Sequence, residues 1–125
     1  MRTNSGTSGI GSAGAYTDAP NTWNIDSFND CCDYNFTEYA FSPDTLIDVY
    51  YNIVDHTFLE GSANPILETW GEIDTLNSYT MHISNNQFIL RDATSENYYK
   101  LWVYDYYDDT NSSGHISLIY DKIND

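Results

Sequence analysis

Basic residues are scarce in this sequence, which has 4 Lys and Arg against 19 Asp and Glu and a formal net charge of −15. Binding to nucleic acid or to an anionic membrane surface needs clustered cations that contact phosphate groups. Because the chain has so few basic residues, we do not expect nucleic acid or an anionic membrane surface as a partner. The simplest interpretation is that the acidic surface keeps the protein soluble. This would also hold in a salty medium, where charges are strongly screened. The alternative interpretation is the binding of cations such as Ca²⁺.

Cysteine is also rare, because Cys31 and Cys32 are the only two and are adjacent in the sequence. Neighbouring Cα atoms lie about 3.8 Å apart, closer than an ordinary disulfide spans. The pair therefore cannot be a long-range disulfide within one chain, and two thiols are too few for a structural zinc site. We expect free or strained vicinal thiols. A thiol enzyme that uses one of them with a distant histidine is the least favoured of three functional hypotheses.

Motifs of catalysis are missing. The sequence has no HExxH motif, and Ser8 is not in a G-x-S-x-G motif because Ile10 occupies the final glycine position. Residues 9–14 match G-x-G-x-x-G, but polar residues precede the match and turn-forming residues follow it. A dinucleotide site needs a strand before this pattern and a helix after it. We therefore predict that the protein is not an enzyme.

Long apolar runs and targeting signals are absent from the sequence as given. No apolar run approaches the length of a membrane span. The first residues after Met1 are polar, whereas a signal peptide has an apolar stretch near its start. Either the protein stays in the cytoplasm or the chain is a piece of a longer precursor, and the second interpretation is favoured by the resemblance described below.

Aromatic residues, in contrast, are abundant: 12 Tyr, 5 Phe and 3 Trp make up 16% of the 125 residues. Aromatic side chains pack well on the pleated surface of a sheet, which favours strands. A chain of this length is one ordinary domain and can bury a core without metal ions or disulfides. We therefore predict a single, mainly β domain over residues 1–125, antiparallel and sandwich-like.

The C-terminal part, residues 66–123, predicts an antiparallel meander. We expect a short strand at 66–70 and a hairpin of strands 79–83 and 87–91, because Asn tolerates the left-handed conformations of tight turns. Alternating apolar residues then predict two long strands on either side of a polar turn at 108–114. Strands that are adjacent in sequence are the simplest to connect as neighbours.

The N-terminal half gives weaker signals. Residues 1–22 are rich in Gly and Ser and predict a flexible loop, and residues 23–41 predict a loop with short extended pieces. Residues 43–56 are ambiguous, since their apolar positions fit both a helix and an alternating strand. We favour a short helix there, because Ser42 and Pro43 resemble the start of a helix.

Three side chains are candidates for holding a haem iron: His56, His82 and Met81. Imidazole and thioether are both axial haem ligands, and the nearby aromatic residues Trp70 and Tyr79 suit a porphyrin. Adjacent strand residues point to opposite faces, so only one of Met81 and His82 can face a given site. The alternative interpretation is a surface histidine and a core methionine.

Both ends of the chain resemble the HmuY-like family of haem-binding lipoproteins and haemophores from Bacteroidetes-type bacteria. At the N-terminus the resemblance rests on Arg2–Gly14, which follows an Arg/Lys-Thr-Asn-x-Gly-x-Ser-Gly pattern. At the C-terminus it rests on four short stretches: Phe88–Ala93, Tyr98–Leu101, Asp105–Tyr107 and Ser113–Ile116. In the family a Trp-Asp-x-Ala-Phe strand precedes the N-terminal pattern, so the resemblance implies a domain that lacks its first part.

This resemblance implies an all-β fold, a cell-surface, outer-membrane or secreted location, and non-catalytic capture of haem for iron acquisition. An outer-membrane receptor or a host haemoprotein would be the partner. Family ligands include a histidine or methionine shortly after a strand that corresponds to 67–71, where this chain has neither. His56 and His82 are therefore the expected ligands, with Met81 as a substitute. The second hypothesis is a surface-exposed interaction module of the same fold that does not bind haem.

Overall fold

The computed structural model describes residues 1–3, 5, 6, 9, 11–31, 40–52, 54–74, 76, 80–94, 96–107, 110 and 114–123. The described strands all pair antiparallel, which confirms the mainly β fold class. Among the described residues no helix is both long and apolar enough to cross a membrane. The predicted polar turn at 108–114 lies largely outside the described residues.

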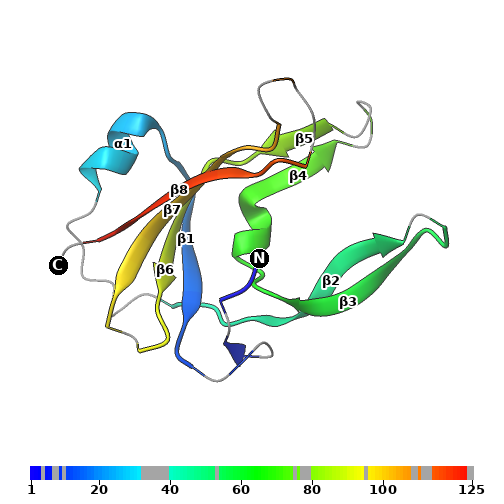
Figure 1. The fold of residues 1–125 in the computed structure, drawn as a ribbon, viewed down its shortest axis with the longest axis horizontal. Coiled ribbons are helices and arrows are strands. Elements are labelled where there is room, and N and C mark those ends of the chain that lie inside the picture. Colours follow the sequence, from blue (N-terminus) through cyan, green and yellow to red (C-terminus); the bar gives the residue numbers. More distant parts are fainter. Residues whose placement is uncertain are drawn as a thin grey trace.

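The main sheet has four strands in the order β1-β6-β7-β8 (Figure 1). The strands are β1 (Gly14–Thr22), β6 (Asn86–Arg91), β7 (Tyr98–Asp105) and β8 (Ser117–Lys122). The predicted meander is thus confirmed for β6, β7 and β8. The prediction of a loop over 1–22 is wrong for β1, because Ala15 and its neighbours pair with β6 and pack on the sheet despite their small size.

Each face of this sheet carries a hydrophobic core. One core contains Trp23, Phe28, Ile89 and Ile123. It is covered by α1 (Ile25–Asp30), so the loop predicted over 23–41 is wrong for this segment. Asn24 and Ser27 form a capping box that starts the helix. The other core contains Ala15, Leu67, Phe88 and Leu101.

Two hairpins project from the main sheet on the same side of the molecule (Figure 1). The first pairs β2 (Thr45–Asn52) with β3 (Thr57–Ala63), and the second pairs β4 (Gly71–Asp74) with β5 (Thr80–Ile83). The helix favoured over 43–56 is therefore wrong. Residues 45–52 form a strand and not a helix because β3 pairs with them and supplies the hydrogen bonds of a strand.

Two further expectations in the C-terminal part are wrong. The strand expected at 66–70 is a short 3₁₀ helix, η3 (Leu67–Trp70), because the Asn64 side chain accepts hydrogen bonds from two successive backbone N–H groups and starts a turn. The hairpin expected around 84–86 does not form, since β5 pairs with β4 whereas β6 pairs with β1 and β7. Asn85 does adopt a left-handed conformation, with φ of 56°, but it links two sheets.

A buried polar cluster fixes the N-terminal segment to the domain. Asp44, 1% exposed, accepts hydrogen bonds from the backbone N–H and hydroxyl of Thr3 and from the Asn64 amide. Ser5 is fully buried, and its hydroxyl accepts a hydrogen bond from the Asp44 backbone N–H at 3.4 Å. Gly6 has φ of 54°, and a Cβ there would lie 2.2 Å from the Asp44 carbonyl oxygen. Only glycine fits this close approach.

Lys100 is a buried cation on β7, 5% exposed. Its ammonium donates to the carbonyl oxygens of Phe28 and Cys31, at the end of α1, and lies 4.5 Å from the centre of the Phe28 ring. It therefore satisfies carbonyl groups that a helix end leaves without partners. Cys31 is disulfide-bonded, so the expectation of free thiols is wrong for this residue; Cys32 lies outside the described residues.

The turn between β6 and β7 is organised by Asp92. Its carboxylate accepts hydrogen bonds from the Asn97 side chain at 2.7 Å and from Thr94, and from the backbone N–H groups of Glu96 and Asn97. These hydrogen bonds, above all that from the Asn97 side chain, lower the pKa of Asp92 from 3.8 to about 2. Desolvation acts in the opposite direction and is outweighed.

Asp92→Asn is expected to lower the melting temperature at neutral pH, because an amide nitrogen would then oppose the Asn97 amide. The charged carboxylate contributes its stability above pH 3.8, and this contribution falls as the pH drops through 2. The difference in melting temperature between wild type and variant should therefore shrink between pH 4 and 2. Melting curves over this range test it, with Asp48→Asn, an exposed carboxylate on β2, as the control. A difference that does not change with pH would contradict the assignment.

Candidate functional site

The β4–β5 hairpin separates a polar face from an apolar one. In the register of the two strands, Glu72 stands opposite His82 and Gly71 stands opposite Ile83. Because side chains alternate along a strand, His82 shares its face with Glu72 and Asp74, whereas Met81 lies on the other face. The structure therefore agrees with the expectation that Met81 and His82 cannot face one site together.

His82 is the more accessible of the two candidates on β5. Its side chain is 62% exposed, and Nε2 lies 3.2 Å from Oδ2 of Asp74. A carboxylate that bonds one imidazole nitrogen fixes the ring orientation and makes the other nitrogen a better ligand. In the tautomer in which Nε2 donates to Asp74, Nδ1 carries the lone pair that can bind a metal.

Met81, on β5, contacts both the facing strand β4 and the segment that follows β7. Its backbone N–H donates to the Tyr107 hydroxyl at 3.0 Å. Its sulfur would lie 3.0 Å from a Cβ on Gly71, so the absence of a side chain at Gly71 leaves room for the thioether. Met81 is partly buried in this arrangement. The thioether therefore fills space on the hairpin's apolar face.

An aromatic cluster lies at the base of the same hairpin. The rings of Trp70 and Tyr106 are 5.7 Å apart, and those of Tyr106 and Tyr107 are 5.4 Å apart. The carboxylate of Asp105 accepts the backbone N–H groups of both tyrosines, at 2.8 and 3.1 Å. The end of β7 therefore presents an aromatic surface next to Trp70. Trp70 directly precedes β4, which pairs with the strand β5 that carries Met81 and His82. Tyr79, the other expected aromatic neighbour, lies outside the described residues.

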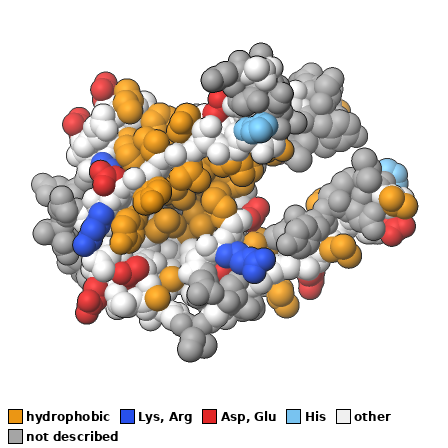
Figure 2. Space-filling model, viewed as in Figure 1, with side chains coloured by type: hydrophobic (Ala, Val, Ile, Leu, Met, Phe, Trp, Pro, Cys, Tyr) orange, Lys and Arg blue, Asp and Glu red, His pale blue; other side chains and the backbone are white. Residues whose placement is uncertain are grey.

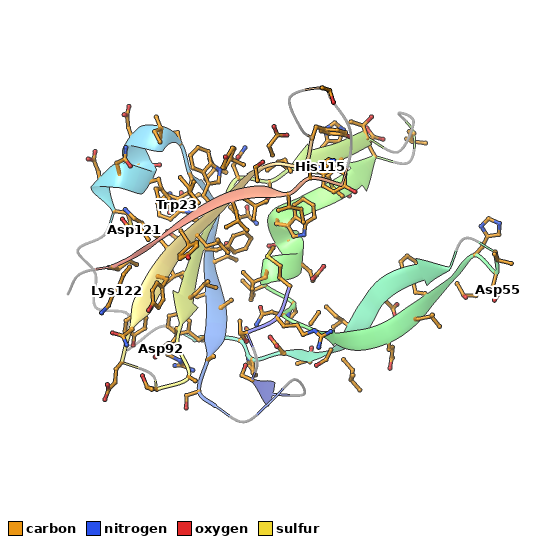
Figure 3. All side chains as sticks on the ribbon, viewed as in Figure 1. Trp23, Asp55, Asp92, His115, Asp121 and Lys122 are labelled. Carbon is orange, nitrogen blue, oxygen red and sulfur yellow. The ribbon has the colours of Figure 1, made fainter. Side chains whose placement is uncertain are left out.

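His115 is a further residue of this region that the sequence did not single out. Its backbone N–H donates to the Tyr106 carbonyl oxygen at 2.9 Å, and its side chain is exposed. Figure 3 shows His115 where the chain enters β8, beside the β4–β5 hairpin. The preceding Gly114, with φ of 84°, makes the turn that brings it there. In the sequence, His115 follows a glycine in a polar turn and belongs to the stretch 113–116 that carries the family resemblance, but nothing there marks it as a ligand.

His56 lies on the other hairpin. It occupies the turn between β2 and β3 with φ of 54°, next to Asp55, which Figure 3 shows at the far end of that hairpin. The hairpin exposes several large apolar side chains: Leu46 60%, Val54 82%, Phe58 60% and Leu59 54%. Figure 2 shows an open notch between this hairpin and the rest of the molecule. The two predicted histidines thus lie on different elements.

Outside the two hairpins, two further kinds of site come into question for the described residues, a metal cluster and a cavity. Within the described ranges no group of three or more His, Cys, Asp or Glu side chains could hold a metal ion. A cavity of about 270 Å³ lies beside the N-terminal segment, and its lining includes Arg2, Leu90 and Tyr99. It is smaller than most small-molecule sites, which measure roughly 300–1,000 Å³. None of the three histidines lines it.

Comparison with known proteins identifies the fold and the family. Three solved structures share the fold: the apo HmuY analogue of Tannerella forsythia (18% identity, TM-score 0.58), a candidate HmuY-like haem-binding protein of Bacteroides vulgatus (15%, 0.58) and a candidate lipoprotein of Bacteroides fragilis (14%, 0.62). They match 90%, 86% and 86% of this chain, which covers 59%, 61% and 59% of theirs.

The chain therefore spans about 60% of the length of these solved relatives. No curated protein sequence matches it. At these identities the three structures show a common fold and no more. The family model of the HmuY protein, however, matches residues 1–120, which is nearly the whole chain. This chain belongs to the HmuY family.

Proposed function

We propose that this chain binds haem or another tetrapyrrole, without catalysis, for iron acquisition at the bacterial cell surface. The observation that carries the proposal is the combination of an accessible, carboxylate-oriented imidazole on β5 and an aromatic cluster at the base of the β4–β5 hairpin. His82 provides the imidazole, and Trp70 and Tyr106 provide the aromatic surface at the base of the same hairpin. An iron porphyrin needs both kinds of group, a ligand for the metal and apolar walls for the ring.

The exposed apolar side chains of the β2–β3 hairpin support the same function. A two-stranded hairpin is only marginally stable in water unless it packs on something. Apolar side chains on such a hairpin, among them Phe58 and Leu59, favour contact with an apolar partner. A flat tetrapyrrole bound beside this hairpin would cover part of that surface. His56 at the turn is an alternative iron ligand, and Met81 is a substitute for His82.

The location and partners follow from the family and form part of the proposal. One solved relative is a candidate lipoprotein, which agrees with a surface or secreted location. A haem-capturing protein at the cell surface would receive haem from a host haemoprotein or deliver it to an outer-membrane receptor. The net charge of −15 weakens long-range attraction of the anionic haem propionates, so apolar contacts and iron ligation must supply the affinity.

An absorbance titration with haemin tests the function. We expect a sharp Soret band and saturation at one haem per chain. His82→Ala should weaken binding by at least about tenfold, because one iron ligand is lost. Thr80→Ala is the matched control, since Thr80 lies on the same strand and, by its register, on the same face as His82.

A spectrum identical to free haemin at all protein concentrations would refute haem binding and favour an interaction module of the same fold. Equal losses for Thr80→Ala and His82→Ala would point to damage of the hairpin rather than to loss of a ligand. Circular dichroism of both variants separates these two cases.

A further inference from the structure

The cavity beside the N-terminal segment lies at the other end of β7 from the aromatic cluster. Tyr99, at the start of β7, lines the cavity, whereas Tyr106, just after the end of this strand, packs against Trp70. β7 has 8 residues and therefore spans about 23 Å. Figure 3 shows Asp92, another lining residue, at this far end of the main sheet. The cavity is thus separate from the β4–β5 hairpin.

Part of the cavity lining is apolar. Leu90 and Tyr99 stand opposite each other in the register of β6 and β7, so their side chains lie on one face of the sheet. Leu67, 3% exposed, belongs to the core on this face and also lines the cavity. Two small residues, Ala13 and Ala93, are further parts of the lining. An aliphatic chain that enters the cavity would lie against these side chains.

The lining reverses the charge balance of the chain. It includes two of the 4 Lys and Arg residues, Arg2 and Arg91, but one of the 19 Asp and Glu residues, Asp92. The oxygens of Asp92 already accept hydrogen bonds from the side chains of Asn97 and Thr94. A cavity in which one sign of charge prevails concentrates ligands of the opposite sign. In a chain with a net charge of −15, this local excess of cations favours an anionic ligand.

Arg2 is the cation that can contact a ligand directly. It is exposed, and among the described residues it has no hydrogen-bond or ion-pair partner. Its main chain is fixed on both sides. The Met1 carbonyl oxygen accepts the Asn64 backbone N–H at 2.8 Å, and the Thr3 backbone N–H donates to the Asp44 carboxylate at 2.9 Å. A guanidinium on such a main chain offers two parallel N–H donors to a carboxylate.

The other two polar groups differ in their availability. Side chains alternate along a strand, so Arg91 leaves the sheet on the face opposite to Leu90. Its Nε donates to the Ser12 carbonyl oxygen at 2.7 Å, and its guanidinium carbon lies 4.8 Å from the centre of the Phe41 ring. Arg91 therefore adds positive charge from behind the cavity. The Tyr99 hydroxyl has no partner within the described part of the chain and can donate to an anion in the cavity.

The volume of the cavity limits the ligand to a small molecule. A water molecule takes roughly 30 Å³ in the liquid, so the cavity of about 270 Å³ admits about nine groups of that size. We propose that it binds a short aliphatic carboxylate of about four to six carbons, with the carboxylate on Arg2 and Tyr99 and the chain against Leu67 and Leu90. A tetrapyrrole is several times larger. This inference therefore goes beyond the proposed function and does not depend on it.

Titration of the isotope-labelled protein with sodium hexanoate, followed by NMR at constant ionic strength, tests this site. We expect saturable shifts of the backbone amides at residues 2–3, 90–93 and 99. Hexan-1-ol has the same chain without the charge, and inorganic phosphate has charge without the chain. Each should bind at least about tenfold more weakly than hexanoate. Equal binding of phosphate and hexanoate would overturn the assignment of an aliphatic carboxylate.

Two variants separate the polar contacts in the same titration. Arg2→Gln keeps a polar side chain and removes the charge, so it should bind hexanoate at least about tenfold more weakly and hexan-1-ol like wild type. Tyr99→Phe removes the hydroxyl alone and should weaken hexanoate binding about fivefold. Lys122→Gln is the matched control, because Lys122 is an exposed cation on β8 outside the lining. Equal effects of Arg2→Gln and Lys122→Gln, or none from Arg2→Gln, would overturn the inference.

The length of the ligand gives a second readout. Each CH₂ group that enters the cavity should tighten binding by up to about fourfold, so hexanoate should bind more tightly than butyrate. Decanoate exceeds the volume and should gain nothing over hexanoate. Haemin should not displace hexanoate, and displacement would contradict a separate site. Absence of haemin binding, in contrast, would refute the proposed function and leave this site intact.

Discussion

Asp44→Ala is expected to lower the free energy of unfolding by about 3 kcal/mol or more, because buried donors are left without an acceptor at roughly 1–3 kcal/mol each. The lost carboxylate accepts three donors, the backbone N–H and hydroxyl of Thr3 and the amide of Asn64. A domain of this kind has a total stability of only about 5–15 kcal/mol. The variant should therefore lose a large fraction of the stability of the domain.

Urea denaturation followed by tryptophan fluorescence measures this loss. Asp48→Ala is the matched control, because it removes the same side chain from an exposed position on the neighbouring β2 strand. The control should change the midpoint little. A loss below about 1 kcal/mol for Asp44→Ala would mean that water replaces the carboxylate and that the N-terminal segment is not fixed by it.

Lys100→Ala is expected to cost about 3 kcal/mol, of which part is packing and part is polar. The change removes a buried side chain from the sheet and leaves the carbonyl oxygens of Phe28 and Cys31 without their donor. It also removes the contact between the ammonium and the Phe28 ring. The end of α1 should then detach from the sheet before the rest of the domain unfolds.

Two variants separate the causes in the same denaturation experiment. Lys100→Met keeps most of the side-chain volume and should recover the packing part of the loss, but not the hydrogen bonds. Lys122→Ala removes an exposed lysine from the adjacent strand β8 and should have little effect. Equal midpoints for Lys100→Ala and Lys122→Ala would contradict a structural role for the buried cation.

Local patterns predicted the C-terminal strands well and the N-terminal half poorly. Tyr98–Asp105 and Ser117–Lys122 alternate apolar and polar positions, and short connections bring such strands together. Gly14–Thr22 has small and polar residues that carry no such pattern, so its role as a strand depends on pairing with Asn86–Arg91 about 70 residues away. The same applies to Thr45–Asn52, whose local signals allowed a helix.

The candidate site divides in a similar way. The opposite orientations of Met81 and His82 follow from the two-residue period of any strand. The bond between His82 and Asp74 does not, because it depends on the cross-strand register of β4 and β5. His115 lies next to the aromatic cluster because its backbone N–H donates to the Tyr106 carbonyl oxygen, a contact that no local pattern shows.

The sequence by itself determined that this protein is mainly β, acidic and a relative of the HmuY family, because composition, strand period and short motifs are properties of neighbouring residues. The tertiary structure alone decided which residues meet. It placed Asp44 against Thr3, Lys100 against α1 and His115 beside the β4–β5 hairpin. Asp44 and Thr3 are 41 residues apart in the sequence, and Lys100 and Cys31 are 69 residues apart. Met81 and Tyr107, which are hydrogen-bonded near His115, are 26 residues apart. No local pattern encodes such pairs, since the register and packing of the whole sheet select them.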